Sequence, residues 1–195
     1  MRIGLISDTR IPGSAKEVPP QVTRAFDGVD LILHAGGIQA ARVLDWLEQI
    51  APVKAVGRIQ GGQYESSTPF RLETTDDPRV AEQQVLQLEG HTIGIVNSLD
   101  LHLLNDDVIP GNIAAKRFPK GAVSTMVESV FGTPVDIVVF GRTLEAMVEE
   151  HDGILFVNPG SPTIPKNFKK LGQVAILELT QESREARIIN LAAIS

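Results

Sequence analysis

The sequence predicts an α/β fold whose second half is rich in antiparallel hairpins. Two turn signals, Glu89-Gly90 and Asp152-Gly153, lie between apolar runs, and Asp-Gly in this setting is among the strongest short-range signals for a hairpin. Earlier in the chain, short apolar runs alternate with helical patterns and are spaced as in βαβ units, at residues 2–6, 30–34 and 53–56.

Two helices are predicted between these first strands. The shorter lies within residues 17–29, where Pro19-Pro20 suits a helix start and Gly28 suits its end. The second covers residues 38–50, because its apolar residues recur at helical spacing on one face. That face holds Val43, Leu44, Leu47 and Ile50. Trp46 lies on the same helix and is expected to pack rather than to recognise a ligand.

The second half is expected to add one longer helix and three antiparallel pairs. The helix covers residues 123–131 and follows Pro119 and Gly121. The paired strands are predicted at residues 84–97, 146–158, and 173–180 with 185–191. Turn-forming residues predict loops at 60–70, 74–79 and 105–112, with a short strand between the first two left open. No linker or internal repeat divides the chain, so a single domain over residues 1–195 is expected.

Composition narrows the classes of function. The chain has 195 residues, a net charge of −6 and no cysteine, which excludes disulfide scaffolds, cysteine–zinc sites and thiol nucleophiles. An acidic chain without a basic run is a poor candidate for binding nucleic acid. No signal-peptide pattern and no apolar run of membrane-spanning length is found, so we expect no membrane association and a cytoplasmic location.

Polar and glycine-rich segments follow four of the predicted strands. These strand ends are Ser7-Asp8-Thr9-Arg10, His34-Ala35-Gly36-Gly37, Phe140-Gly141-Arg142-Thr143-Leu144 and Asn158-Pro159-Gly160-Ser161-Pro162. Their order and spacing resemble the calcineurin-like metallophosphoesterase superfamily, above all its small bacterial and archaeal phosphodiesterase branch, which also contains the retromer scaffold subunit. The most specific segments are "VNPGSP" and "DLILHAGGI". The resemblance implies a four-layer α/β/β/α sandwich of two mixed β-sheets flanked by helices.

The resemblance also implies a two-metal site, and most of its ligands are replaced here. The family uses Asp-x-His, Gly-Asp, Gly-Asn, a His and Gly-His-x-His at its strand ends, so that two metals clamp phosphate and activate water. In this chain Asp8 is the only intact ligand position. The replacements are Arg10 for the first His, Gly37 for the bridging Asp, Ile59 after Gly57-Arg58 for the Asn, Asn97 for the next His, and Arg142 and Leu144 for the last pair.

A buried lone carboxylate is costly, whereas a paired one is tolerable. We therefore predict one ion cluster of Asp8, Arg10 and Arg142 in place of the metals, with spare guanidinium donors for a phosphate-like or carboxylate anion. A single metal at Asp8 and arginines that reach only solvent are the alternatives. The candidate pocket residues are Asp8, Arg10, Gly36, Gly37, Arg58, Asn97, Arg142 and Asn158.

The remaining candidates favour structural roles. His34 is expected to be an orienting core histidine rather than a catalytic base. His91 is expected to be solvated in a turn, and His102 and His151 show no partner in the sequence. Gly36-Gly37 is expected to form a tight turn with positive φ.

Three functions remain open. The leading hypothesis is a degenerate metallophosphoesterase-like protein, without cofactor, that binds a small anion or a protein partner at the former active site. The second is an active phosphodiesterase or phosphatase with a rearranged or single-metal site holding Mn, Fe or Zn. The third is a protein-interaction scaffold, which rests on fold analogy alone. A homo-oligomer is left open.

Overall fold

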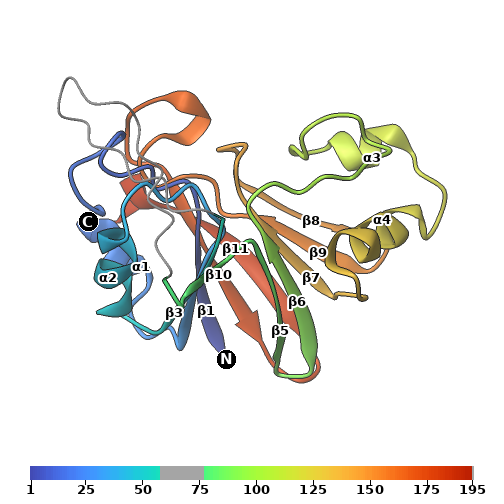
Figure 1. Cartoon of the computed structure of the whole chain (residues 1–195), viewed down its shortest axis with the longest axis horizontal. Coiled ribbons are helices and arrows are strands. Elements are labelled where there is room, and N and C mark those ends of the chain that lie inside the picture. The colour runs from blue at the N-terminus through green and yellow to red at the C-terminus, as the bar shows by residue number, and fades with distance from the viewer. Residues whose placement is uncertain (58–76, 195) are drawn as a thin grey trace.

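Two mixed β-sheets face each other in the computed structural model of the chain, which describes residues 1–57 and 77–194 (Figure 1). The order across the first sheet is β11 (Arg184–Asn190), β10 (Gln173–Leu179), β1 (Arg2–Ile6), β2 (Leu31–His34), β3 (Val53–Val56) and β4 (Val80–Ala81). The order across the second is β5 (Gln83–Leu88), β6 (His91–Val96), β7 (Ile137–Phe140), β9 (Ile154–Asn158) and β8 (Met147–His151).

Strand direction places the strand ends together. In the first sheet β1, β2, β3 and β4 run parallel, while β10 pairs antiparallel with both β1 and β11. In the second sheet β6, β7 and β9 run parallel between the antiparallel edges β5 and β8. Because the carboxyl ends of parallel strands share one edge, the loops after β1, β2, β6, β7 and β9 leave the sheets at a common edge.

Helices cover the outer face of each sheet (Figure 1). Helices α1 (Pro20–Ala25) and α2 (Arg42–Glu48) lie on the first sheet, and α3 (Asn112–Lys116) and α4 (Ala122–Phe131) lie on the second. Short 3-10 turns are η1 (Pro165–Asn167) and η2 (Leu191–Ala193).

Three apolar clusters fill the spaces between these layers. One joins α1 and α2 to the first sheet, the second fills the space between the sheets, and the third joins α4 to the second sheet. The alternation of side chains along a strand explains this division: in β1, Ile3 and Leu5 face the other sheet, while Ile6 belongs to the helix side. The predicted four-layer α/β/β/α sandwich is confirmed.

The predicted elements in the described residues are found, with one helix shortened and two short elements added. Both hairpin turns are present, with left-handed backbone at Glu89 and Asp152. The helix predicted at residues 38–50 is shorter, from Arg42 to Glu48, and before it Gln39 Oε1 accepts the Gly13 N–H at 3.0 Å. Helix α3 and strand β4 were not predicted, since five and two residues are too short to show periodicity. The loop at 60–70, the first half of that at 74–79 and the strand left open between them lie outside the described residues.

Candidate functional site

The strand-end segments singled out in the sequence meet at one place. The Asp8 N–H donates to the Gly36 carbonyl at 2.7 Å, and the Arg10 N–H donates to the Gly37 carbonyl at 3.0 Å. The Asn97 side-chain amide donates to the Ala35 carbonyl at 2.8 Å. These bonds join the segments after β1, β2 and β6, which is the convergence that the parallel strand ends predict. Arg58, another candidate, lies outside the described residues.

Asp8 is the centre of this arrangement, and its carboxylate is engaged on both oxygens. Its side chain is 1% exposed. Oδ1 accepts from the Arg10 guanidinium, with Nη2 at 3.3 Å and Nε at 3.4 Å, and Oδ2 accepts the Arg142 backbone N–H at 2.7 Å. Burial raises the pKa of Asp8, and the charge of Arg10 opposes that rise. The predicted Asp8–Arg10 ion pair is therefore present.

Arg142 is not part of the ion cluster, so the prediction of a third member is wrong. The Arg142 side chain is 58% exposed, and its Nε lies 3.5 Å from Asp107 Oδ1 instead. Its backbone is left-handed, with φ of 72°, and this conformation turns the N–H toward Asp8 while the side chain points away. The arginine thus contributes to Asp8 through its main chain alone, which sequence reasoning did not foresee.

The glycine pair after β2 brings the backbone against Asp8 and Asn97. Gly36 and Gly37 have φ of 88° and 74°, which confirms the predicted positive-φ turn. A Cβ at position 37 would lie 2.5 Å from Asp8 Oδ1, and a Cβ at position 36 would collide with the Asn97 side chain. Position 37 corresponds by resemblance to the bridging carboxylate of the family, so the space for that side chain is already filled by Asp8.

His34 is held in one tautomer inside the first sheet. It is fully buried, its Nδ1 accepts the Gly36 N–H at 3.2 Å, and its Nε2 lies 3.2 Å from Thr9 Oγ1. The accepted bond requires an unprotonated Nδ1, so the proton is on Nε2 and points at Thr9. Burial lowers the pKa of His34 to about 3, so the ring is neutral at ordinary pH. As predicted, it is a core histidine, and here it orients the turn beside Asp8.

The segment after β9 holds the segments after β7 and β1 in place. Asn158 Nδ2 donates to the Gly141 carbonyl at 3.3 Å and to Thr143 Oγ1 at 2.9 Å, and its Oδ1 accepts the Gly160 N–H at 2.9 Å. The buried Ser161 hydroxyl donates to the Asp8 carbonyl oxygen at 2.8 Å. Asn158 is fully buried, so its polar atoms serve the frame of the site.

Two histidine predictions are wrong. His91 opens strand β6 and is buried, with Nε2 2.9 Å from the Thr180 carbonyl oxygen. His151 pairs with Glu149 at 2.8 Å and meets the ring of Phe156 edge-on at 5.7 Å. Thr180 is distant in sequence from His91, so only the tertiary fold could show that contact.

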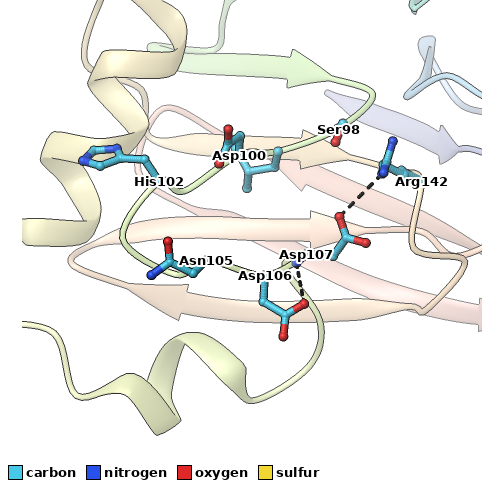
Figure 2. Close-up of a pocket in the computed structure, with 8 residues that line it drawn as sticks. Ser98, Asp100, His102, Asn105, Asp106, Asp107 and Arg142 are labelled. Carbon is cyan, nitrogen blue, oxygen red and sulfur yellow. Dashed lines mark hydrogen bonds and ion pairs between the residues drawn. The ribbon is translucent and has the colours of Figure 1, made fainter.

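A pocket beside this site was missed by sequence reasoning. It has a cavity volume of about 620 Å³ and lies under the loop that follows β6 (Figure 2). Its lining residues are Ser98, Leu99, Asp100, His102, Asn105, Asp106, Asp107 and Arg142. The "NDD" at 105–107 was the available signal, and it was interpreted only as turn chemistry. Figure 2 shows the Arg142 side chain directed toward Asp107.

The described side chains offer little for a metal ion. Within residues 1–57 and 77–194, no three His, Cys, Asp or Glu side chains gather closely enough to hold one. In that part of the chain, the Asp8 carboxylate contacts the Arg10 guanidinium and the Arg142 backbone N–H and lies against Gly37, and none of these is a ligand for Mn, Fe or Zn. None of the helices in the described part of the chain is long and apolar enough to cross a membrane.

Comparison with known proteins agrees with this architecture. Residues 1–182 match the family model of the calcineurin-like phosphoesterase superfamily domain. A probable metallophosphoesterase of Methanothermobacter thermautotrophicus is 28% identical over 193 residues, which cover 99% of this chain and 94% of the relative.

Solved structures show the same fold. Vps29 of Entamoeba histolytica, solved with Zn²⁺, superposes with a TM-score of 0.62 at 17% identity, covering 98% of this chain and 99% of Vps29. An archaeal phosphodiesterase superposes with a TM-score of 0.59 at 15% identity, covering 97% and 100% of the two chains. With the family model matching nearly the whole sequence, the chain belongs to the calcineurin-like phosphoesterase superfamily.

Proposed function

We propose that this chain is a superfamily member without two-metal phosphoester hydrolysis, and that its strand-end edge serves as a binding surface for a protein partner. One observation carries the first part: both oxygens of the one remaining ligand carboxylate, Asp8, are engaged by the chain's own donors. A metal at Asp8 would have to displace the Arg10 guanidinium, and among the residues that the structure describes it would find one anionic ligand there.

The electrostatics favour a protein partner over a small anion. Anion binding was predicted from two guanidinium groups facing a single carboxylate. Arg142 is instead directed to Asp107, so Asp8 and Arg10 balance each other and the expected surplus of positive charge is missing. An anion would have to compete with Asp8 for Arg10 alone.

A metal titration joined to a hydrolysis assay tests this proposal. We expect no calorimetric binding of Mn²⁺ in the micromolar range to the metal-stripped chain. We also expect no hydrolysis of bis-p-nitrophenyl phosphate when Mn²⁺ is added, because no described residue set both activates water and neutralises the leaving oxygen. Elemental analysis of the purified chain gives the bound metal directly.

The runner-up, an active phosphodiesterase with a single or rearranged metal site, predicts the opposite. Two metals per chain at micromolar affinity would establish it. So would hydrolysis that is lost in Asp8→Ala and kept in Asp106→Ala, a matched removal of a carboxylate from the neighbouring pocket.

A further inference from the structure

Exposed apolar side chains gather on two loops at the strand-end edge. Among the described residues, the large apolar side chains that are exposed are Val85, Leu103, Phe168 and Leu171. Leu103 is 52% exposed and lies in residues 98–107, here called the acidic loop; Phe168, at 69%, and Leu171 lie in residues 163–172, called the basic loop. Soluble chains usually bury residues such as Phe, so this placement points to a contact surface.

The basic loop is fixed in shape. The Phe168 N–H donates to the Pro165 carbonyl at 3.0 Å, and the Lys170 N–H donates to the Thr163 carbonyl at 3.2 Å. The Gly172 N–H closes the base of the loop on the Pro162 carbonyl at 3.0 Å. Phe168 is therefore held outward by an ordered backbone. A preordered aromatic side chain loses little conformational freedom when a partner covers it.

The two loops carry opposite charge. The basic loop presents Lys166, Lys169 and Lys170, all exposed. The acidic loop presents three carboxylates around the 620 Å³ cavity, those of Asp100, Asp106 and Asp107 (Figure 2). One carboxylate, Glu145, accompanies the lysines at 3.7 Å from Lys166, and one guanidinium, Arg142, accompanies the aspartates. Each loop thus keeps a surplus of its own sign.

Both loops flank one turn, the segment 141–146 that joins β7 to β8. The Lys166 N–H donates to the Leu144 carbonyl at 3.2 Å on one side, and Arg142 lines the cavity on the other. Two residues span at most about 7 Å of backbone, so the basic and acidic loops approach the same turn from its two sides. The part of the strand-end edge that carries both loops is here called the two-loop face. Figure 1 shows the segments between β9 and β10 and between β6 and α3 at the same upper edge of the molecule.

We propose that the two-loop face pairs with the same face of a second copy of the chain. A two-fold rotation brings the basic loop of each copy onto the acidic loop of the other, so one contact is made twice. Phe168 and Leu171 then meet the exposed Leu103 of the partner copy and the mouth of its cavity. A surface with one loop of each sign side by side is complementary to itself, which selects a second copy over other occupants. An anionic lipid surface fits less well, because the whole chain carries a net charge of −6.

This inference rests on the proposed binding role and names the partner as a second copy of the chain. Its failure can be distinguished from a failure of the proposed function. Oligomeric state decides the pairing, whereas metal binding and hydrolysis decide the loss of catalysis. An active enzyme that dimerises through this face, or an inactive monomer, would each overturn one proposal and leave the other standing.

Charge reversal with rescue provides the test. The loop variant carries Lys169→Glu and Lys170→Glu, and the pocket variant carries Asp100→Lys and Asp106→Lys. The control, Lys54→Glu with Lys120→Glu, makes the same charge change as the loop variant at two exposed lysines outside both loops. Circular dichroism confirms that each variant is folded, and sedimentation equilibrium gives its mass against 21.1 kDa for one chain.

We expect the wild type and the control to sediment as dimers that weaken with added salt. The loop variant and the pocket variant alone should be monomers, with dissociation constants raised at least about tenfold. Mixed in equal amounts, the two variants should form a 1:1 dimer. The reversed residues 163–172 of one variant are then negative and face the reversed residues 98–107 of the other, which are positive, and the two unchanged loops also face each other with opposite charge. A wild type that is monomeric up to its solubility limit overturns the proposal. The proposal is also overturned if both charge-reversed variants are still dimers, or if the two monomeric variants do not associate when mixed.

Discussion

At the scale of single residues, Asp8 shows how the fold compensates a buried carboxylate at a family ligand position. A buried carboxylate needs compensation, and here a guanidinium and a backbone N–H supply it. Because burial raises the pKa of Asp8 above its unfolded value, the carboxyl contributes stability at pH below the unfolded pKa. That contribution is lost as the pH rises through the folded pKa.

Removal of Arg10 should therefore destabilise the fold in a pH-dependent way. At neutral pH, Arg10→Leu should lower the free energy of unfolding by about 1 kcal/mol, since Arg10 is partly exposed and its contacts to Asp8 are long. Without Arg10 the pKa of Asp8 rises further, so the loss should shrink as the pH falls and Asp8 becomes protonated. Urea denaturation across acidic to neutral pH measures this trend.

Two controls accompany that measurement. Arg142→Leu should cost less than Arg10→Leu, because its exposed guanidinium does not contact Asp8. In the Asp8→Asn background, Arg10→Leu should have little effect, since no buried charge remains to be stranded. An equal loss with and without Asp8 would show that Arg10 acts by packing alone.

Gly37 offers a second test at the same scale. Gly37→Ala should lower the free energy of unfolding by more than about 2 kcal/mol, because the new Cβ meets Asp8 and the backbone is left-handed. Gly90→Ala is the matched control: Gly90 has φ of 82° and a Cβ added there would meet nothing within 4 Å, so this variant isolates the backbone term. Thermal denaturation of both variants separates the two terms. If both variants lost the same free energy of unfolding, the added Cβ at position 37 would cost nothing beyond the backbone term. The segments after β1 and β2 could then move apart enough to accept a side chain there.

At the scale of elements, one arginine ties the short strand β4 to helix α2. Arg79 forms a two-bond contact with Asp77, with Nε–Oδ1 at 2.9 Å and Nη2–Oδ2 at 2.6 Å. It also reaches Asp45 and Glu48 on α2, each at 2.8 Å. Strand β4 has only two residues, so side-chain contacts must replace the hydrogen bonds that a longer strand would form.

Arg79→Met should lower the free energy of unfolding by about 1 kcal/mol and increase amide exchange in β4 and in the second half of α2, where Asp45 and Glu48 lie. Hydrogen bonds from Arg79 hold the pKa of Asp77 below its usual value, so part of this stabilisation is present above that usual value and is lost as the pH falls through the lowered pKa of the folded state. Arg187→Met is the matched control, since the Arg187–Glu178 pair is 3.4 Å long and more than half exposed on both sides. If Arg79→Met and Arg187→Met showed the same amide exchange in β4 and α2, Arg79 would not be what holds β4 to α2.

At the scale of the whole molecule, the end of the chain completes the sheet that its beginning starts. Strand β10 lies between β1 and β11, and the register pairs Ile3 with Leu177 and Leu5 with Ala175. These residues share the cluster that joins the two sheets. The N-terminal strands therefore cannot bury their apolar faces without the last hairpin.

Unfolding should accordingly be one cooperative transition, which is the expectation for a single domain. Differential scanning calorimetry should give equal calorimetric and van't Hoff enthalpies. A chain ending at residue 172 should lack a cooperative transition, because β1 would lose its antiparallel neighbour. Two resolved transitions in the full chain would instead indicate two domains.

Local patterns in the sequence determined the kind of fold and most of its elements. Apolar runs, Glu89-Gly90 and Asp152-Gly153 depend on neighbours within a few residues, so they predict strands and hairpins directly. The motifs after four strands indicated the family. Asp8 and Arg10 belong to one contiguous motif, so their closeness was predictable, whereas the closeness of Gly36-Gly37 was expected from the resemblance alone.

Only the tertiary structure decided where the side chains around Asp8 point. The Arg142 guanidinium turns to Asp107 because its backbone is left-handed, and His91 is buried because β6 begins beside Thr180. The acidic cavity and its closeness to the basic loop likewise depend on loops that are distant in sequence. A sequence pattern does not show the backbone conformation at a single position or the packing of segments that are distant in the chain. Burial and hydrogen bonding in the complete fold determine both.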